Sequence, residues 1–283
     1  MDNLRLKIMV PIIFLFLSAN FVVFGAIFSE HKGLKVSALN IGQGDSILIE
    51  SPSGVTMLID GGPDDSLLSR LNEESGFLKK RINFLMVSNP DKDHIAGFIS
   101  LLERYTVDSV ILPGTISGTE TYQAFLKEVQ KKGPKIFLAR RGERIDFGDG
   151  VYMDILFPDR SPYLFDTNTG SIITKLYYGK TSVLFTGDAP GEVEEYVTLI
   201  DKDLIKSDVL KVAHHGSKNS SFLVFLEKVN PEYALISNGA KNKYGHPHKQ
   251  ALDNLSKVNA KILRTDLLGT VRLFSDGLKF KQI

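Results

Sequence analysis

From residue 34 almost to the end of the chain, short apolar segments typical of β-strands alternate with segments that have the pattern of helices. The series opens with strand-like runs at 34–41, 46–50 and 55–59, separated by turn compositions rich in Gly, Pro and Asp. Strands that alternate with helices form mixed sheets covered by helices. The sequence therefore predicts an α/β (α+β) domain, and two similar β-rich halves packed face to face are compatible with this order.

No linker rich in Pro, Gly or Ser interrupts this pattern, so one domain over residues 29–283 is expected. Further strands are predicted at 84–88, 109–112, 135–138, 151–157, 171–178, 181–186, 208–213, 233–237, 261–264 and 270–274. Helices are predicted at 65–80, 95–104, 120–132, 191–199, 222–229 and 249–258.

The N-terminal segment 1–28 is a separate piece. Residues 8–28 carry no charge and follow Arg5 and Lys7; as a helix they would extend about 31 Å, close to the roughly 30 Å hydrocarbon core of a bilayer. We predict a transmembrane helix that anchors the domain on the extracytoplasmic side. A cleaved signal peptide, which would release a secreted protein, is the alternative, although its apolar region is usually about 7 to 15 residues long.

Composition narrows the chemistry. Lys and Arg number 34 against 33 Asp and Glu, so no global field attracts a polyanion, and a nucleic acid would have to bind at a local site. The chain has no cysteine, which excludes disulfides, thiolate metal sites and cysteine nucleophiles. Any metal must be held by histidines and carboxylates.

The first cluster of candidate ligands comes directly after the predicted strand 84–88. Asp91, Asp93 and His94 lie within four residues of one another, and Pro90 provides the irregular turn that lets adjacent side chains share a cation. The alternative is a helix start, with Asn89 as its cap and the acids near the positive end of the helix dipole.

Three more polar groups follow strands later in the chain. Asp188 comes after strand 181–186, and it is a metal ligand or a helix cap. His214 and His215 leave strand 208–213 ahead of a glycine, which suits metal ligation or general base work, the alternative being an exposed loop. His246 lies in a loop where it can act as a base or a substrate contact, or be a solvated turn residue.

Together these groups predict a metal site at the loop ends of several strands. Mixed imidazole and carboxylate ligands suit Zn, Mn or Fe better than Ca. The chemistry implied is metal-assisted hydrolysis, because a bound cation lowers the pKa of water from 15.7 toward about 7. Asp60, at the end of another strand, is either a turn acid or an acceptor that orients a ligating histidine. The predicted ligands are Asp91, Asp93, His94, Asp188, His214 and His215.

Seven motifs in order resemble the metallo-β-lactamase superfamily, and within it the hydrolase domain of ComEC-type competence (DNA-internalisation) proteins. The resemblance spans nearly all of residues 36–280 and implies an αββα sandwich, with the metal site at one edge of the two sheets and phosphodiesterase or nuclease activity supported by Mn or Zn. The motifs are NIGQGDS (40–46), LIDGG (58–62), PDKDH (90–94), TGD (186–188), LKVAHHGS (210–217), YGHP (244–247) and RTD (264–266).

The chain departs from the family pattern in two ways. The family motif resembles H-x-D-x-D-H, whereas Asn89 stands in the leading position, and a neutral amide is a poor ligand for a transition metal. We therefore expect one Zn or Mn ion rather than two, held by Asp93, His94, Asp188 and one of the paired histidines. Proteins of this type also carry a multi-helix membrane channel, which would here belong to a separate partner protein.

The predicted function is a membrane-anchored hydrolase of phosphodiesters, such as single-stranded DNA, that uses a metal-bound hydroxide. Asp93 and His246 are the predicted catalytic residues, His246 as the proton carrier. The alternatives are a catalytically degenerate partner module of a DNA-uptake machinery and a hydrolase of small esters or lactones. Predicted substrate contacts, which could equally be ordinary helix caps, are Asn168, Ser171, Ser217, Lys218 and Ser221.

Overall fold

The chain divides into two units, Met1–Gly33 and Leu34–Ile283. In the computed structural model, placements are described for residues 11–14, 16, 18, 33–76 and 80–283. Residues 11–14, 16 and 18 are helical, and most of the predicted transmembrane segment 8–28 lies outside the described residues. Within the described part of the chain, no helix has both the length and the hydropathy needed to cross a membrane.

Two mixed β-sheets form the second unit, as predicted. The first sheet runs in the order β15 (Phe280–Gln282), β14 (Val271–Ser275), β1 (Leu34–Ala38), β2 (Ile47–Glu50), β3 (Thr56–Ile59), β4 (Arg81–Met86), β5 (Thr106–Leu112) and β6 (Lys135–Leu138). The second runs in the order β13 (Lys261–Arg264), β12 (Tyr233–Ile236), β11 (Val209–Lys211), β10 (Thr181–Phe185), β9 (Ile173–Tyr178), β8 (Val151–Phe157) and β7 (Arg144–Gly148). Strands β3 to β6 are parallel, as are β10 to β13, and the other pairs are antiparallel.

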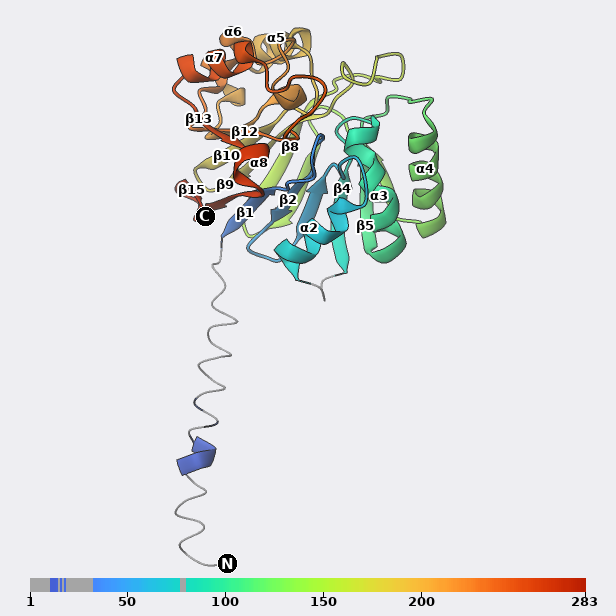
Figure 1. Ribbon diagram of the computed structural model, residues 1–283, viewed down its shortest axis with the longest axis vertical. Coiled ribbons are helices and arrows are strands. Elements are labelled where there is room, and N and C mark those ends of the chain that lie inside the picture. The colour runs from blue at the N-terminus through green and yellow to red at the C-terminus, as the bar shows by residue number, and fades with distance from the viewer. Residues whose placement is uncertain (1–10, 15, 17, 19–32, 77–79) are drawn as a thin grey trace, which may run out of the picture. The chain divides into compact units, whose positions relative to one another are not determined.

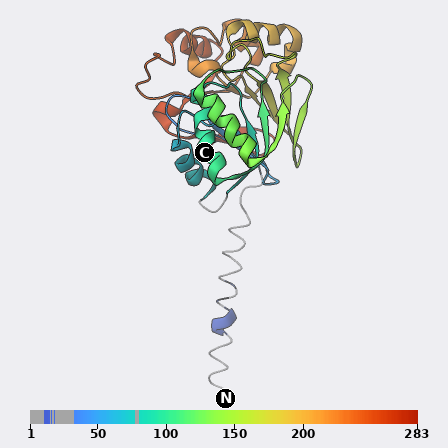
Figure 2. The same cartoon turned by 90° about the vertical axis from the view of Figure 1, so that its right-hand side faces the viewer.

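Helices cover the outer face of each sheet. Apolar side chains of α2 (Ser66–Ser75), α3 (Lys92–Arg104) and α4 (Glu120–Lys132) pack against the first sheet. Those of α5 (Gly191–Asp201), α6 (Leu223–Val229) and α7 (Lys249–Lys257) pack against the second. Figure 1 shows the two helix groups on different sides of the domain, and α4 lies in front in the turned view of Figure 2. The layers are therefore helix, sheet, sheet and helix.

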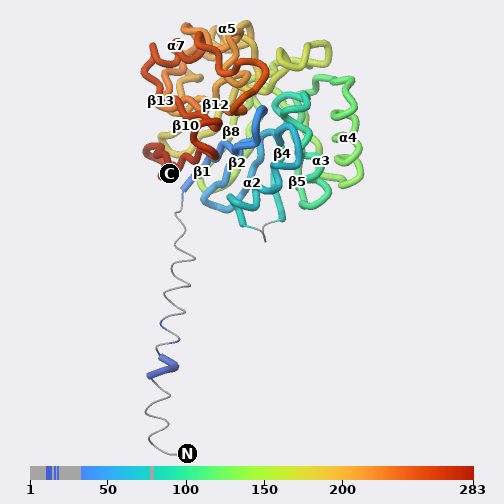
Figure 3. Tube along the Cα trace, in the orientation of Figure 1, coloured from blue at the N-terminus to red at the C-terminus, as the bar shows by residue number. Residues whose placement is uncertain are grey.

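The strands between these layers are apolar on both faces. In β2, Ile47 and Ile49 belong to the core between the sheets, while Leu48 belongs to the core beneath the helices of the first sheet. Since successive side chains of a strand point to opposite faces, a continuous apolar run buries both. Strand β1 pairs with β14 from the far end of the chain, which Figure 3 shows as blue beside red.

The structure corrects several predicted boundaries. Helix α2 ends at Ser75 rather than at residue 80, and β4 begins at Arg81 rather than at residue 84. Helix α3 begins at Lys92, three residues earlier than predicted. Strands β7 and β15 and the helix α8 (Thr265–Leu268) were not predicted, because all three are short and the two strands are partly exposed at sheet edges.

Candidate metal centre and active site

The candidate ligands follow the carboxyl ends of parallel strands. Asp60 follows β3, Asp93 and His94 follow β4, Asp188 follows β10, and His215 follows β11. Strands β3 and β4 are parallel neighbours in the first sheet, and β10 and β11 in the second. Loops at the carboxyl ends of parallel strands gather at one edge of a sheet, where α/β proteins place their ligands.

His94 lies in the first turn of α3 and is fully buried. Its Nδ1 lies 2.9 Å from Oδ2 of Asp60, and its Nε2 lies 3.2 Å from Oδ2 of Asp188. Asp60 is fixed by hydrogen bonds from the backbone N–H of Ser88 (2.8 Å) and from the Ser88 hydroxyl (2.5 Å). A carboxylate on Nδ1 sets the ring orientation and leaves Nε2 free to bind a metal.

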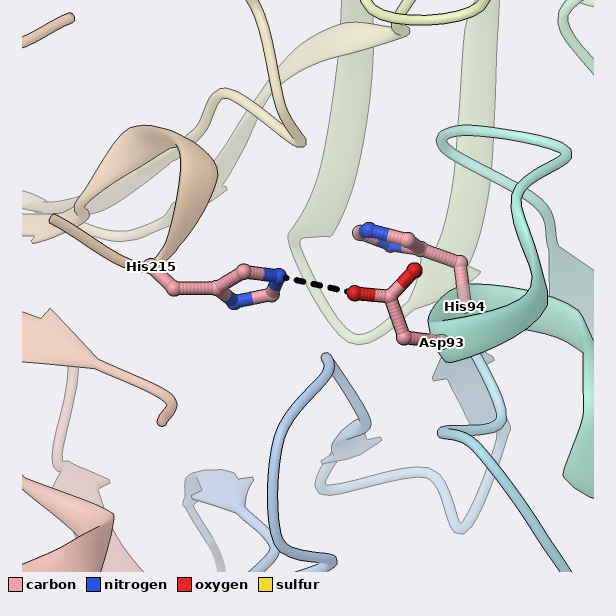
Figure 4. Close-up of side chains that lie close together, drawn as sticks. All are labelled: Asp93, His94 and His215. Carbon is pink, nitrogen blue, oxygen red and sulfur yellow. Dashed lines mark ion pairs between the residues drawn. The ribbon is translucent and has the colours of Figure 1, made fainter. Parts of the chain in front are cut away.

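His215 faces His94 from the short 3₁₀ helix η2 (Ala213–Gly216). Its Nδ1 lies 2.9 Å from the carbonyl oxygen of Ser237, and its Nε2 lies 3.4 Å from Oδ2 of Asp93 and 3.7 Å from Oδ2 of Asp188. Figure 4 shows Asp93 and His94 from the start of α3 pointing toward His215. The paired histidines have φ values of 49° and 55°, a left-handed backbone that sends their two rings in different directions.

Four side chains form a cage in which the ring nitrogens lie close enough to the carboxylates to share a transition metal. The contacts among Asp93, His94, Asp188 and His215 are 3.2, 3.4 and 3.7 Å. A tetrahedral ion with ligands at about 2.0–2.1 Å requires atoms about 3.3 Å apart. Nε2 of both histidines and Oδ1 of Asp188 are buried without a hydrogen bond. Because unpaired buried polar atoms are costly, these atoms fit a cation as their common partner.

The carboxylates around the cage favour the protonated forms of His94 and His215, so metal binding must displace protons from these rings. Burial opposes the imidazolium form, but the Asp188 and Asp60 carboxylates outweigh it and raise the pKa of His94 well above its usual value. His215, also buried, has its pKa raised to about 10 by Asp188 and Asp45. A metal ion therefore competes with protons for both Nε2 atoms, and its affinity rises with pH.

Two groups of side chains could each hold an ion: Asp93, His94 and His215, or Asp45, His94 and Asp188. Within each group the ligand atoms lie within 4.8 Å of one another. His94 belongs to both groups, while Asp60 engages its Nδ1, so Nε2 can serve one ion at a time. The two groups therefore share one ring nitrogen, and the number of ions stays a prediction.

Asp91 and Asn89 lie outside both ligand groups. The Asn89 side chain donates to Oδ1 of Asn168 at 2.7 Å and accepts from the backbone N–H of Asp91 at 3.0 Å. Oδ2 of Asp91 accepts a hydrogen bond from the Thr167 hydroxyl at 3.0 Å. Asn89 therefore ties the ligand loop to the segment 167–168, and the Asn168 oxygen predicted to contact substrate is engaged by Asn89.

His214 and His246 lie on the open side of the centre. Nε2 of His214 is 3.9 Å from Oδ2 of Asp188, its side chain is 28% exposed, and its ring centroid is 5.5 Å from that of His246. Burial and the neighbouring imidazoles lower the pKa of His246 to about 4. His246 is therefore neutral near pH 7, but it is a weak base there, whereas an efficient proton carrier has a pKa near the working pH. Its role as the proton carrier stays a prediction.

The serines predicted to contact substrate are buried. Ser171 accepts a hydrogen bond from the backbone N–H of Asp188 at 3.3 Å, and Ser217 accepts one from Asn219. Ser171 and Ser221 have no exposed surface and Ser217 has 4%. The hydroxyls of Ser171 and Ser217 thus have partners in their own loops, and the three serines are buried in this structure. Their contact with a substrate stays a prediction. Lys218 is exposed, and its backbone N–H donates to Nδ1 of His248.

Sequence reasoning missed three buried charged residues near the site. Asp45 lies 2.7 Å from Nζ of Lys211 and 3.3 Å from Nδ1 of His215. It belongs to the NIGQGDS motif, which could have singled it out, whereas Lys211 sits in an otherwise apolar strand. Glu194 of α5 accepts hydrogen bonds from the backbone N–H groups of Ser221 (2.7 Å) and Phe222 (3.4 Å), which hold the loop after η2. No sequence signal separates Glu194 from its acidic neighbours.

Glu194 predicts a pH-dependent stability. Burial raises its pKa from 4.5 to about 8 despite the backbone hydrogen bonds. Between these values the folded state holds a proton that the unfolded state has lost, so the stability falls as pH rises, by up to about 1.4 kcal/mol per pH unit. Glu194→Gln should therefore be more stable than wild type at pH 8 and comparable near pH 4.5. Urea unfolding of both proteins across this range measures the effect, and parallel curves would contradict it.

A cavity beneath the centre is too small for a substrate. It has a volume of about 10 Å³, room for about one water molecule, and its walls include Asp45, Asp60, Ser88 and Lys211. Asp93, by contrast, has a side chain that is 33% exposed. A substrate therefore has to approach from the loop side, where Asp93 and His214 reach solvent.

Comparison with known proteins agrees with this geometry. Residues 39–239 match the family model described as Metallo-beta-lactamase superfamily. The chain is 31% identical over 255 residues to ComE operon protein 3 of Bacillus subtilis (84% of this chain, 32% of that protein), and 28% identical over 254 residues to Competence protein ComA of Neisseria gonorrhoeae (88% and 33%). It thus spans about a third of the length of these relatives.

A solved structure supports the fold. The metallo-beta-lactamase fold protein YhfI of Bacillus subtilis superposes with a TM-score of 0.54 at 14% identity, over 82% of this chain and 96% of that chain. The competence relatives confirm the ComEC-type resemblance predicted from the motifs. Because the family model covers most of the folded unit, the chain belongs to the metallo-beta-lactamase superfamily.

Proposed function

We propose that this protein is a membrane-anchored, metal-dependent phosphodiesterase that acts on single-stranded DNA or related phosphodiesters. The observation that carries the proposal is the cage of Asp93, His94, Asp188 and His215, in which buried ring nitrogens and a carboxylate oxygen lack hydrogen bonds. The relatives named for competence favour a nucleic acid as substrate. Zn or Mn suits the mixed nitrogen and oxygen ligands.

The surrounding residues supply orientation and proton transfer. When bound, a divalent cation acts as a Lewis acid that makes water more acidic and neutralises charge on a phosphoryl oxygen. Asp60 and Ser237 hold the Nδ1 atoms of His94 and His215, so both rings present Nε2 to the centre. His246, neutral near pH 7 and beside His214 on the open side, receives the proton from water and returns one to the leaving group.

Asp93→Ala tests this proposal. The full chain in detergent, supplied with Mn²⁺ or Zn²⁺, should hydrolyse bis-p-nitrophenyl phosphate and single-stranded DNA. Loss of the Asp93 carboxylate should lower kcat/KM at least about 100-fold, which corresponds to about 2.7 kcal/mol of transition-state stabilisation. Asp253→Ala is the matched control, because Asp253 pairs with Lys249 on the exposed side of α7. A wild-type protein inactive with both metals would refute the proposal.

Asn89 favours a second candidate function, that of a non-catalytic partner module. Its amide replaces the leading histidine of the family motif and is engaged by Asn168 and by the Asp91 backbone. Elemental analysis after reconstitution separates the candidates: a hydrolase should retain about one metal ion per chain, and a degenerate module well under half an ion.

The cellular setting belongs to the same proposal. The uncharged run 8–28 supports an anchor, and we place the catalytic domain on the extracytoplasmic side. The chain spans about a third of its competence relatives, and we propose a separate membrane-channel protein as its partner. Crosslinking in intact cells, followed by identification of the captured membrane protein, tests that partner.

A further inference from the structure

Lys211 is a fully buried cation directly behind the candidate centre. It ends β11 and is 1% exposed. Its Nζ lies 2.7 Å from Oδ2 of Asp45 and donates to the carbonyl oxygen of Val212 at 2.9 Å. A buried ion pair is rarely more stable than an apolar pair of the same shape, because both charges must be desolvated. Stability alone therefore does not account for a lysine at this position.

The carboxylate of Asp45 can pair with a metal ion or with Lys211, and the position of its backbone is compatible with both. Two backbone hydrogen bonds fix the loop. The N–H of Asp45 donates to the carbonyl oxygen of Asp93 (3.2 Å), and the N–H of Gly62 donates to the carbonyl oxygen of Asp45 (2.9 Å). From this fixed position the carboxylate could join His94 and Asp188 around a cation. In the structure Oδ2 pairs with Lys211, and Oδ1 lies 3.3 Å from Nδ1 of His215 without a hydrogen bond.

The opposite charge of Lys211 explains why Asp45 pairs with it. Oδ2 of Asp45 is already paired with Nζ of Lys211. Within the cage, the carboxylates of Asp93 and Asp188 already match the charge of a divalent ion. If the lysine were removed, the buried carboxylate of Asp45 would lose its cation and would be drawn to the metal ion.

We propose that Lys211 is a built-in counter-cation that holds the carboxylate of Asp45 and keeps it off the metal ion. The ion is thereby left with four protein ligands, Asp93, His94, Asp188 and His215. Without the lysine charge, Asp45 becomes a fifth, oxygen ligand. This inference rests on the metal-binding part of the proposed function and does not depend on the substrate.

Co²⁺ is the probe, because its visible absorption is intense in four-coordinate sites and several-fold weaker in five-coordinate sites. The full-length wild-type chain should bind about one Co²⁺ with intense absorption. Lys211→Met and Lys211→Gln should still bind one Co²⁺, with absorption reduced several-fold. They should also bind Mn²⁺ about tenfold more tightly in titration calorimetry, since Mn²⁺ favours added carboxylate oxygen. Lys211→Gln removes the charge but can still donate hydrogen bonds, so it provides the test if Lys211→Met does not fold.

Two further variants make the test specific. Asp45→Asn in combination with Lys211→Met removes the freed ligand and should restore the intense absorption. Lys175→Met is the matched control: Lys175 is also a buried strand lysine, but its Nζ donates to the carbonyl oxygens of Leu204 and Lys206. It should leave the spectrum unchanged.

The proposal is overturned if Lys211→Gln keeps the wild-type spectrum and Mn²⁺ affinity, if the double variant fails to restore the spectrum, or if wild type binds no Co²⁺. A protein that binds Co²⁺ as expected and hydrolyses no phosphodiester would refute the proposed substrate and leave the role of Lys211 standing.

Discussion

His94→Ala should abolish tight metal binding, with a loss of affinity well above 100-fold. His94 belongs to both groups of candidate ligands, and its Nε2 lies 3.2 Å from Asp188. Its removal leaves the buried Asp60 and Asp188 without their imidazole partner, which should also lower the free energy of unfolding by about 3 kcal/mol or more. Titration calorimetry with Zn²⁺ and circular dichroism measure the two effects.

Asp60→Asn should lower the metal affinity less than His94→Ala does. Asp60 touches His94 and Ser88 but lies outside both ligand groups, so its loss should cost roughly 10- to 100-fold in metal affinity. His248→Ala is the control, because it removes a histidine near the site that is in neither group. Equal losses in the Asp60 and His94 variants would mean that His94 is not itself a ligand.

Gly97→Ala should destabilise the protein by about 3 kcal/mol, the second large effect. A Cβ at Gly97 would lie 2.1 Å from the carbonyl oxygen of Gly61 and 2.6 Å from that of Asp64, so backbone would have to move. In an open helix the same change would gain about 1 kcal/mol. The contact joins α3 to the loop after β3, and so joins His94 to Asp60.

Gly118→Ala is the matched control for that variant. A Cβ at Gly118 meets nothing within 4 Å, and its φ lies outside the left-handed region, so its stability should change little. Urea unfolding compares the midpoints of the two variants with that of wild type. If Gly97→Ala unfolds at the wild-type midpoint, the close approach of α3 to this loop does not contribute to stability.

Much of the fold was predictable because the strands are buried on both faces. Continuous apolar runs such as β2 mark a covered sheet, and polar residues just after such runs mark its functional edge. The edge strands β7 and β15 gave no such signal. They are short and partly exposed, so their sequences resemble loops.

The site was predictable by residue type more than by geometry. His214 and His215 are adjacent and chemically identical, and their separation into an open-side and a buried ring depends on left-handed backbone angles. Lysine is normally exposed, so nothing in the sequence predicts that Lys211 is buried against Asp45. The burial of Ser171, Ser217 and Ser221 was not predictable either, because the sequence around each of them resembles an exposed turn.

The candidate ligands come from both sheets, so metal binding depends on how the sheets pack together. Asp93 and His94 come from the first half of the chain, while Asp188 and His215 come from the second. Neither half of the chain supplies all four of these side chains, so the complete set exists only when both sheets are in place. A metal ion bound by ligands from both sheets would stabilise the packing of one sheet on the other, because it binds only when the two are correctly associated.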